Sequence, residues 1–246
     1  MANWQDPQMT GASAAQVSVP RAARDVGLRS YMLSVYNYMA SGVLLTGIVA
    51  LLFAPYAGQV LIQADGRGMS GLGWIVMLSP LAIVFAMSFG AQRMRTSTLQ
   101  LLFWAFAGLM GLSMSTLFLV YTGTSIAQTF FATAAAYMGL SLYGYTTKRD
   151  LSGMGTFLIM GVWGLILASI VNIFLGSSAL QFAISAIGVL VFAGLTAYDT
   201  QQIKEMYYEG DGALVAGRKA IMGALRLYLD FINMFMFMLQ FLGNRE

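Results

Sequence analysis

Long hydrophobic stretches separated by short charged segments dominate the pattern of the chain. No Asp, Glu, Lys or Arg occurs from Thr96 to Thr147 or from Leu151 to Tyr198. Because one membrane-spanning helix needs about 20 predominantly apolar residues, each stretch holds two helices, divided near residues 121–125 and 176–178. With three further apolar runs, the pattern predicts an all-α integral membrane protein, a bundle of seven transmembrane helices. They are expected at Tyr31–Phe53, Leu72–Gly90, Leu99–Val120, Ile126–Tyr145, Thr156–Leu175, Leu180–Ile203 and Ala220–Leu242.

The segments outside these runs set the expected domain boundaries. Residues 1–24 are polar and small, which predicts a disordered cytoplasmic tail, and residues 25–246 form the seven-helix domain. Pro55 is expected to end the first helix, whereas Pro80 is expected to lie inside the second as a tolerated kink. The charged segment from Lys204 to Lys219 is expected to be a loop.

Lys and Arg are distributed unequally between alternate loops. One side carries ten basic residues and the other two, which is a strong positive-inside signal. The ten are Arg21, Arg24, Arg29, Arg93, Arg95, Lys148, Arg149, Lys204, Arg218 and Lys219, and the two are Arg67 and Arg245. The N-terminus is therefore expected in the cytoplasm and the C-terminus outside, with the lipid bilayer as the chain's main surroundings.

Composition narrows the chemistry. The chain is 58% hydrophobic and 9% charged, whereas a soluble domain is about 25% charged, so a soluble globule is excluded. Cys and His are both absent, which removes disulfides, thiolate sites and the residue that usually titrates near neutral pH. Any response to pH must therefore come from carboxylates. The net charge of +3 is small and gives no support to nucleic-acid binding.

Two acidic residues interrupt the apolar runs of the last two predicted helices, Asp199 and Asp230. An ionisable side chain inside a membrane segment is costly and marks a functional site by default. Both lie in the cytoplasmic halves of neighbouring antiparallel helices, so we expect them to meet. Two carboxylates in contact share a proton more cheaply than both ionise, and their oxygens suit Ca²⁺. The predicted site is a pH sensor that binds Ca²⁺ weakly.

Each aspartate also has a purely structural interpretation. Arg226 precedes Asp230 by one helical turn and would neutralise it, while Asp199 is close enough to the interface to reach water or Lys204. Asn233 follows Asp230 at i+3 and is expected to line the same cavity. Arg226 and Asn233 are thus the predicted neighbours of the pair.

Four stretches together resemble the bacterial branch of the Bax inhibitor-1 (transmembrane Bax inhibitor motif) family, from about Leu28 to the C-terminus. They are Leu195-Thr-Ala-Tyr-Asp-Thr-Gln-Gln-Ile-Lys204, Leu227-Tyr-Leu-Asp-Phe-Ile-Asn233, Leu28–Ala40 and Ser141–Ser152. The resemblance implies a multi-pass protein of the bacterial plasma (inner) membrane, with its C-terminal helix central in a seven-helix bundle. It further implies a pH-sensitive calcium leak controlled by a di-aspartyl sensor, here Asp199 and Asp230, without a tightly bound cofactor. The family's gating latch is an arginine near the cytoplasmic end of the second helix, for which Arg93 is the better candidate and Arg95 the alternative.

Two other functions compete with a leak. Intramembrane aspartyl proteases carry Tyr-Asp in one helix, as in Tyr198-Asp199, but require Gly-x-Gly-Asp in the next, where this chain has Leu227-Tyr-Leu-Asp230. We therefore expect no enzyme. The other alternative is a regulatory partner of a membrane protease or of the stress or cell-death machinery, docking through residues 1–24 and 204–219.

Overall fold

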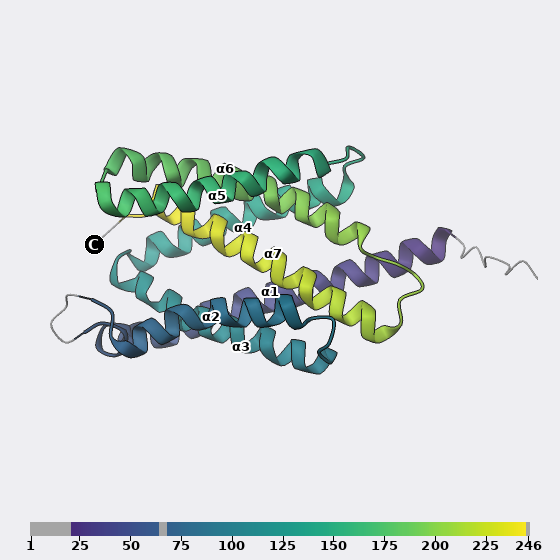
Figure 1. The fold of residues 1–246 in the computed structure, drawn as a ribbon, viewed down its shortest axis with the longest axis horizontal. Coiled ribbons are helices and arrows are strands. Elements are labelled where there is room, and N and C mark those ends of the chain that lie inside the picture. Colours follow the sequence, from purple (N-terminus) through teal and green to yellow (C-terminus); the bar gives the residue numbers. More distant parts are fainter. Residues whose placement is uncertain (1–20, 64–67, 245–246) are drawn as a thin grey trace, which may run out of the picture.

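The computed structural model describes residues 21–63 and 68–244, and this part of the chain is helical throughout (Figure 1). A single isolated bridge between Ile62 and Met69 closes the loop between the first two helices. The helices are α1 Arg21–Leu61, α2 Gly71–Gly90, α3 Thr96–Met114, the 3₁₀-helix η1 Ser115–Leu119, α4 Gly123–Thr146, α5 Ser152–Leu175, α6 Ser178–Glu205 and α7 Ala213–Leu242.

The last helix, α7, lies at the centre of the bundle. It runs between a layer of α1, α2 and α3 and a layer of α4, α5 and α6 (Figure 1), and it packs against α1, α3, α4 and α6. In its most apolar window 61% of the residues are buried, against 17% to 39% in the other candidate spans. The two layers therefore wrap α7, and groups on α7 are the most shielded from lipid.

Among the described residues, six helices are long and apolar enough to cross a membrane, and α4 is not one of them. Hydroxyl-bearing side chains lower the hydropathy of α4, and they recur at every fourth position on its buried face. They are Ser125, Thr129, Thr133, Tyr137 and Ser141. Apolar residues such as Phe131 and Met138 are exposed instead. This arrangement, polar inside and apolar outside, is the inverse of a soluble helix and suits contact with lipid.

Three predicted boundaries are corrected. Helix α1 begins at Arg21, within the segment expected to be a tail, and residues 1–20 lie outside the described part. It also continues through Pro55 to Leu61, so Pro55 does not end it. Helix α7 begins at Ala213, which reduces the predicted loop to residues 206–212. Lys219 Nζ forms an ion pair with Asp211 Oδ2 at 2.5 Å. The charged residues that suggested a loop therefore stabilise the first turns of α7.

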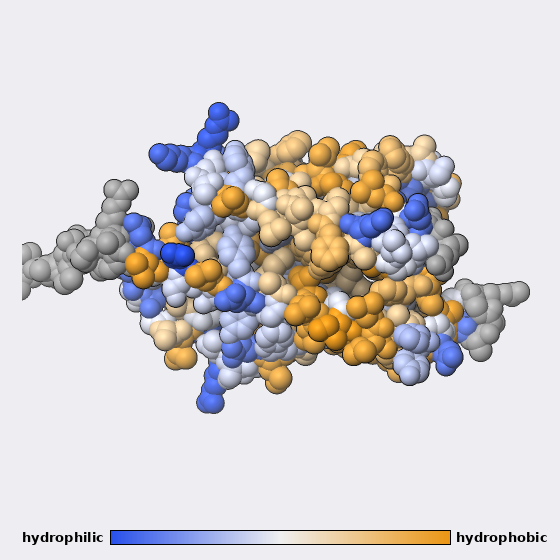
Figure 2. Space-filling view, turned by 180° about the vertical axis from the view of Figure 1, so that it is seen from behind, coloured by the Kyte–Doolittle hydropathy of each residue, from blue (hydrophilic) through white to orange (hydrophobic). Residues whose placement is uncertain are grey.

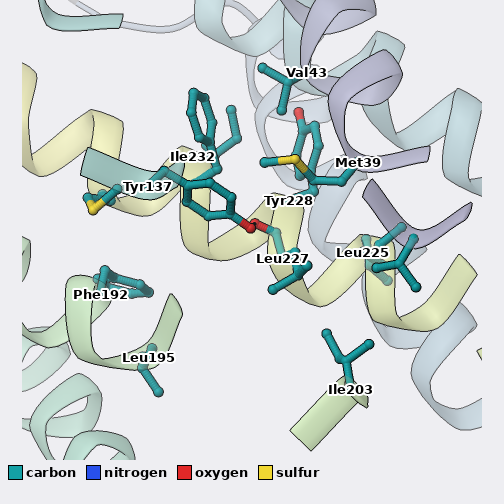
Figure 3. Packing of buried hydrophobic residues seen from close by; sticks show 14 of the residues in the cluster. Met39, Val43, Tyr137, Phe192, Leu195, Ile203, Leu225, Leu227, Tyr228 and Ile232 are labelled. Atoms are coloured by element: carbon teal, nitrogen blue, oxygen red, sulfur yellow. The ribbon is translucent and has the colours of Figure 1, made fainter. Parts of the chain in front are cut away.

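A small polar junction joins α1, α3 and α7 inside the apolar core, in which Figure 3 shows Tyr228 of α7. The Tyr228 hydroxyl is hydrogen-bonded to Thr46 Oγ1 at 2.6 Å, and Thr46 donates to the Ala107 carbonyl at 2.8 Å. Phe106 packs edge-on against the Tyr228 ring, with centroids 5.0 Å apart. Beside it, Gly111 lets α3 approach α1, because a Cβ there would overlap the Thr46 backbone. These contacts hold α7 in a fixed register against α1 and α3.

Candidate functional site

Asp199 on α6 and Asp230 on α7 meet in the interior. They are 8% and 5% exposed, and their carboxyl groups lie close enough together to share a hydrogen bond. A hydrogen bond between two carboxyl groups needs a proton on one of them. Oδ2 of Asp230 is buried and has no hydrogen-bond partner among the described residues. The two carboxyl groups are therefore neighbours in the interior, and one oxygen of Asp230 is left without a hydrogen-bond partner in the described part of the chain.

The cation beside the pair is Arg226. Its Nη1 lies 3.6 Å from Asp199 Oδ1, so it bridges α7 to α6 and does not simply neutralise Asp230 along its own helix. The Arg226 side chain is 51% exposed, whereas that of Asp199 is 11% exposed. Lys204, the other candidate partner of Asp199, instead donates to the Tyr145 carbonyl at 2.8 Å. The half-exposed Arg226 is thus the positive charge next to both buried aspartates.

Hydroxyl groups on the buried face of α4 bond to the two helices that carry the pair, and the sequence interpretation missed them. Tyr137 donates to the Leu227 carbonyl at 3.2 Å and points toward α7 (Figure 3). Tyr36 and Ser141 are hydrogen-bonded at 2.7 Å, and Ser141 and Thr200 at 3.0 Å, which links α1, α4 and α6. The fourfold spacing of hydroxyl-bearing residues along α4 was the signal that this face is buried.

Among the described residues, no side-chain hydrogen bond or ion pair joins the other predicted site residues to the pair. Asn233 is half-buried, and its amide donates to the Leu229 carbonyl of its own helix at 2.8 Å. Arg93 and Arg95 are exposed in the turn between α2 and α3, and within the described residues neither shows a side-chain contact with Asp199 or Asp230. The latch assignment of Arg93 or Arg95 stays a prediction.

The pair by itself offers fewer oxygen ligands than a calcium site needs. Ca²⁺ takes six to eight oxygen ligands, and the pair supplies two carboxyl groups. No group of three or more acidic, His or Cys side chains comes together in residues 21–63 and 68–244. The described residues thus do not form a complete calcium site at the pair.

Comparison with known proteins identifies the family. A sequence model described as "Inhibitor of apoptosis-promoting Bax1" matches residues 28–246. The chain belongs to the Bax inhibitor-1 family. It is 51% identical to an uncharacterized protein of Rickettsia prowazekii over 90% of this chain and 92% of that protein. It is 45% identical to the inner membrane protein YbhL of Escherichia coli, over 92% of this chain and 95% of that protein.

Membership of the Bax inhibitor-1 family agrees with the fold. In the described part of the chain six helices have the length and apolarity to cross a bilayer, and the relative YbhL is named as an inner membrane protein. The chain is a multi-pass protein of the bacterial plasma membrane.

Proposed function

We propose that this member of the Bax inhibitor-1 family is a pH-sensitive calcium leak channel, with Asp199 and Asp230 as its proton sensor and cation-binding groups. The observation that carries the proposal is the direct contact of the two buried carboxyl groups across the α6–α7 interface. The role is one of transport, not of catalysis.

The proposed topology has seven spans with the N-terminus in the cytoplasm. Support for α4 as the seventh comes from its two ends. At one end Asn244, just after α7, donates to Ser125 Oγ at 2.9 Å, and at the other Lys204, near the end of α6, holds the Tyr145 carbonyl. Helix α4 thus extends from the C-terminal end of α7 to the C-terminal end of α6, the same length of the bundle that these two helices cross. The proposed orientation rests on the basic residues, two of which, Arg67 and Arg245, lie outside the described residues.

Gating follows from competition for the same oxygens. When both carboxyl groups are ionised, two negative charges face each other in a poorly solvated interior, and they need Arg226 or a Ca²⁺ ion nearby. Protonation removes the charge that holds either cation. Each proton taken up thus changes the contact between α6 and α7 and shifts the balance between two arrangements of these helices. Because Arg226 is half-exposed, solvated cations have a route to displace it.

The test is ion flux in vesicles containing only the purified protein. Vesicles loaded with a calcium-sensitive dye are stepped through pH 5–9, with Na⁺ and proton flux followed in parallel. The proposal predicts Ca²⁺ flux above that of empty vesicles, with a size that depends on pH. If Ca²⁺ flux equals that of empty vesicles at every pH, the leak is wrong and a regulatory partner role takes its place.

A further inference from the structure

A cavity of about 860 Å³ separates α1 from α4 on the outside of the bundle. Its walls are apolar side chains of these two helices, such as Met32, Val43 and Ala134, and its floor is Phe231 of the central helix. Leu33 and Met138, also in its lining, are 52% and 66% exposed. The cavity is therefore a groove that opens on the surface where lipid lies, and we call it the α1–α4 groove.

The α1–α4 groove continues along the bundle. A second cavity of about 300 Å³ shares Val43, Leu44, Phe130 and Phe231 with the first and extends toward η1. Together the two cavities form one long apolar groove that runs along the helices. Seen from behind, the surface between the two ends of the bundle is largely hydrophobic, as expected for a face in the hydrocarbon core (Figure 2).

Water is a poor occupant of this groove. Three of the four hydroxyl groups in its wall already have partners, since Tyr36 and Ser141 bond each other and Tyr137 donates to the Leu227 carbonyl. A buried water needs two to four polar partners. An empty groove would leave its apolar walls without dispersion contacts on one side. The groove thus calls for a hydrocarbon occupant.

A transmembrane helix is too wide for the groove as it stands. The Tyr36–Ser141 hydrogen bond, at 2.7 Å, ties α1 to α4 across it. A helix with its side chains is about 10–12 Å in diameter, so a second copy or a foreign helix would have to break that bond. A single acyl chain is narrower and requires no such separation.

Charge distinguishes one mouth of the groove. Arg29 is the only charged residue in the lining of the larger cavity, and it is exposed at the basic end of α1. Tyr145 lines the same region, and Lys204 Nζ lies 5.3 Å from the centre of its ring. Arg29 thus provides a positive charge at the cavity wall for a lipid phosphate, and Lys204 adds a second positive charge beside the Tyr145 ring.

We propose that the α1–α4 groove binds an anionic glycerophospholipid from the leaflet at the basic end, with an acyl chain along Val43 and Phe231 and its phosphate at Arg29. The site is separate from the aspartate pair and does not depend on calcium flux. It makes the protein a lipid-binding protein. One wall residue of the groove, Tyr137, also donates to the Leu227 carbonyl of α7, the helix that carries Asp230.

The test uses phosphatidylglycerol that carries a photoreactive group in its acyl chain, in vesicles of phosphatidylcholine with the full-length protein. After irradiation, labelled peptides are mapped. The proposal predicts label concentrated on residues 32–44 and 130–142. Ala134→Phe, which fills the groove, reduces that label severalfold, whereas Ala136→Phe, on the exposed face of the same helix, leaves it unchanged.

A second variant tests the headgroup without altering the groove. Arg29→Gln reduces the preference for phosphatidylglycerol over a matched photoreactive phosphatidylcholine by about fivefold, while Lys148→Gln, exposed at the same basic end, does not. Label spread evenly over all lipid-facing helices would overturn the proposal. So would equal labelling of the two alanine variants, an unchanged lipid preference in Arg29→Gln, or cross-linking of a second copy of the chain through the groove.

Discussion

Arg226 on α7 forms its ion pair with Asp199 on α6, at 3.6 Å, although Asp230 is one turn away on its own helix. The guanidinium therefore fastens two helices at the point where the two acids meet. It is half-exposed, whereas the acids are buried. A buried charge pair with a base that still contacts solvent is well placed to exchange that base for another cation.

Removing this base is expected to change how the pair responds to pH. Arg226→Gln takes away the positive charge beside Asp199 and so disfavours the ionised form of the pair. The midpoint of the pH dependence of Ca²⁺ flux should move to higher pH, by up to about one unit because the ion pair is partly solvated. Lys148→Gln, exposed in the loop before α5, is the control. An unchanged midpoint in Arg226→Gln would remove the arginine from the mechanism.

The latch assigned from the family resemblance is tested by two neighbouring variants. Arg93→Ala is expected to raise the leak at alkaline pH more than Arg95→Ala, as measured by Ca²⁺ flux in vesicles at pH 8. Both side chains are exposed in the turn between α2 and α3, so neither change should unfold the protein. The reverse order would make Arg95 the latch, and no effect from either would leave Arg226 as the only base acting on the pair.

The hydroxyl chain that links α1, α4 and α6 should stabilise the bundle. Ser141→Ala removes hydrogen bonds to both Tyr36 and Thr200. We expect a loss of about 0.5–1.5 kcal/mol in the free energy of unfolding, measured by denaturation in detergent. Ser34→Ala is the matched control, since Ser34 is only partly buried and bonds the Ser30 carbonyl of its own helix. Equal stability of the two variants would show that the interhelical chain contributes nothing.

Two glycines of α4 should respond in opposite ways to alanine. A Cβ at Gly144 would overlap the backbone carbonyl of Ala197 on α6, whereas a Cβ at Gly139 meets open space. Gly144→Ala should therefore destabilise the protein by about 1–3 kcal/mol by forcing α4 from α6. Gly139→Ala should be neutral or slightly stabilising, because alanine is the better helix former. Thermal unfolding in detergent compares them, and similar midpoints would contradict the close approach of α4 and α6.

The sequence predicted those features that depend on burial along one helix. Asp199 and Asp230 stood out because each interrupts an apolar run, and antiparallel neighbours were enough to expect their contact. The partner of Arg226 was not predictable in this way. Spacing along a helix points to Asp230, whereas the observed partner depends on how α6 and α7 are rotated against each other.

Helix boundaries failed for a related reason. Pro55 was expected to stop α1, but a proline interrupts only the hydrogen bond of its own turn, and packing carries the helix to Leu61. Arg218 and Lys219 suggested a loop by their charge. In the structure they lie in α7 and reach backbone carbonyls of Gln92 and Met206. Contacts with such distant residues cannot be predicted from the hydropathy of the segment itself.

The most direct test of the central claim compares Ca²⁺ flux against pH in Asp199→Asn, Asp230→Asn and the double variant. Because the two carboxyl groups act as one proton-sharing unit, each single variant should flatten the pH dependence, and the double variant should resemble the singles instead of adding their effects. Wild-type pH dependence in both single variants, with equal protein incorporation, would contradict the account.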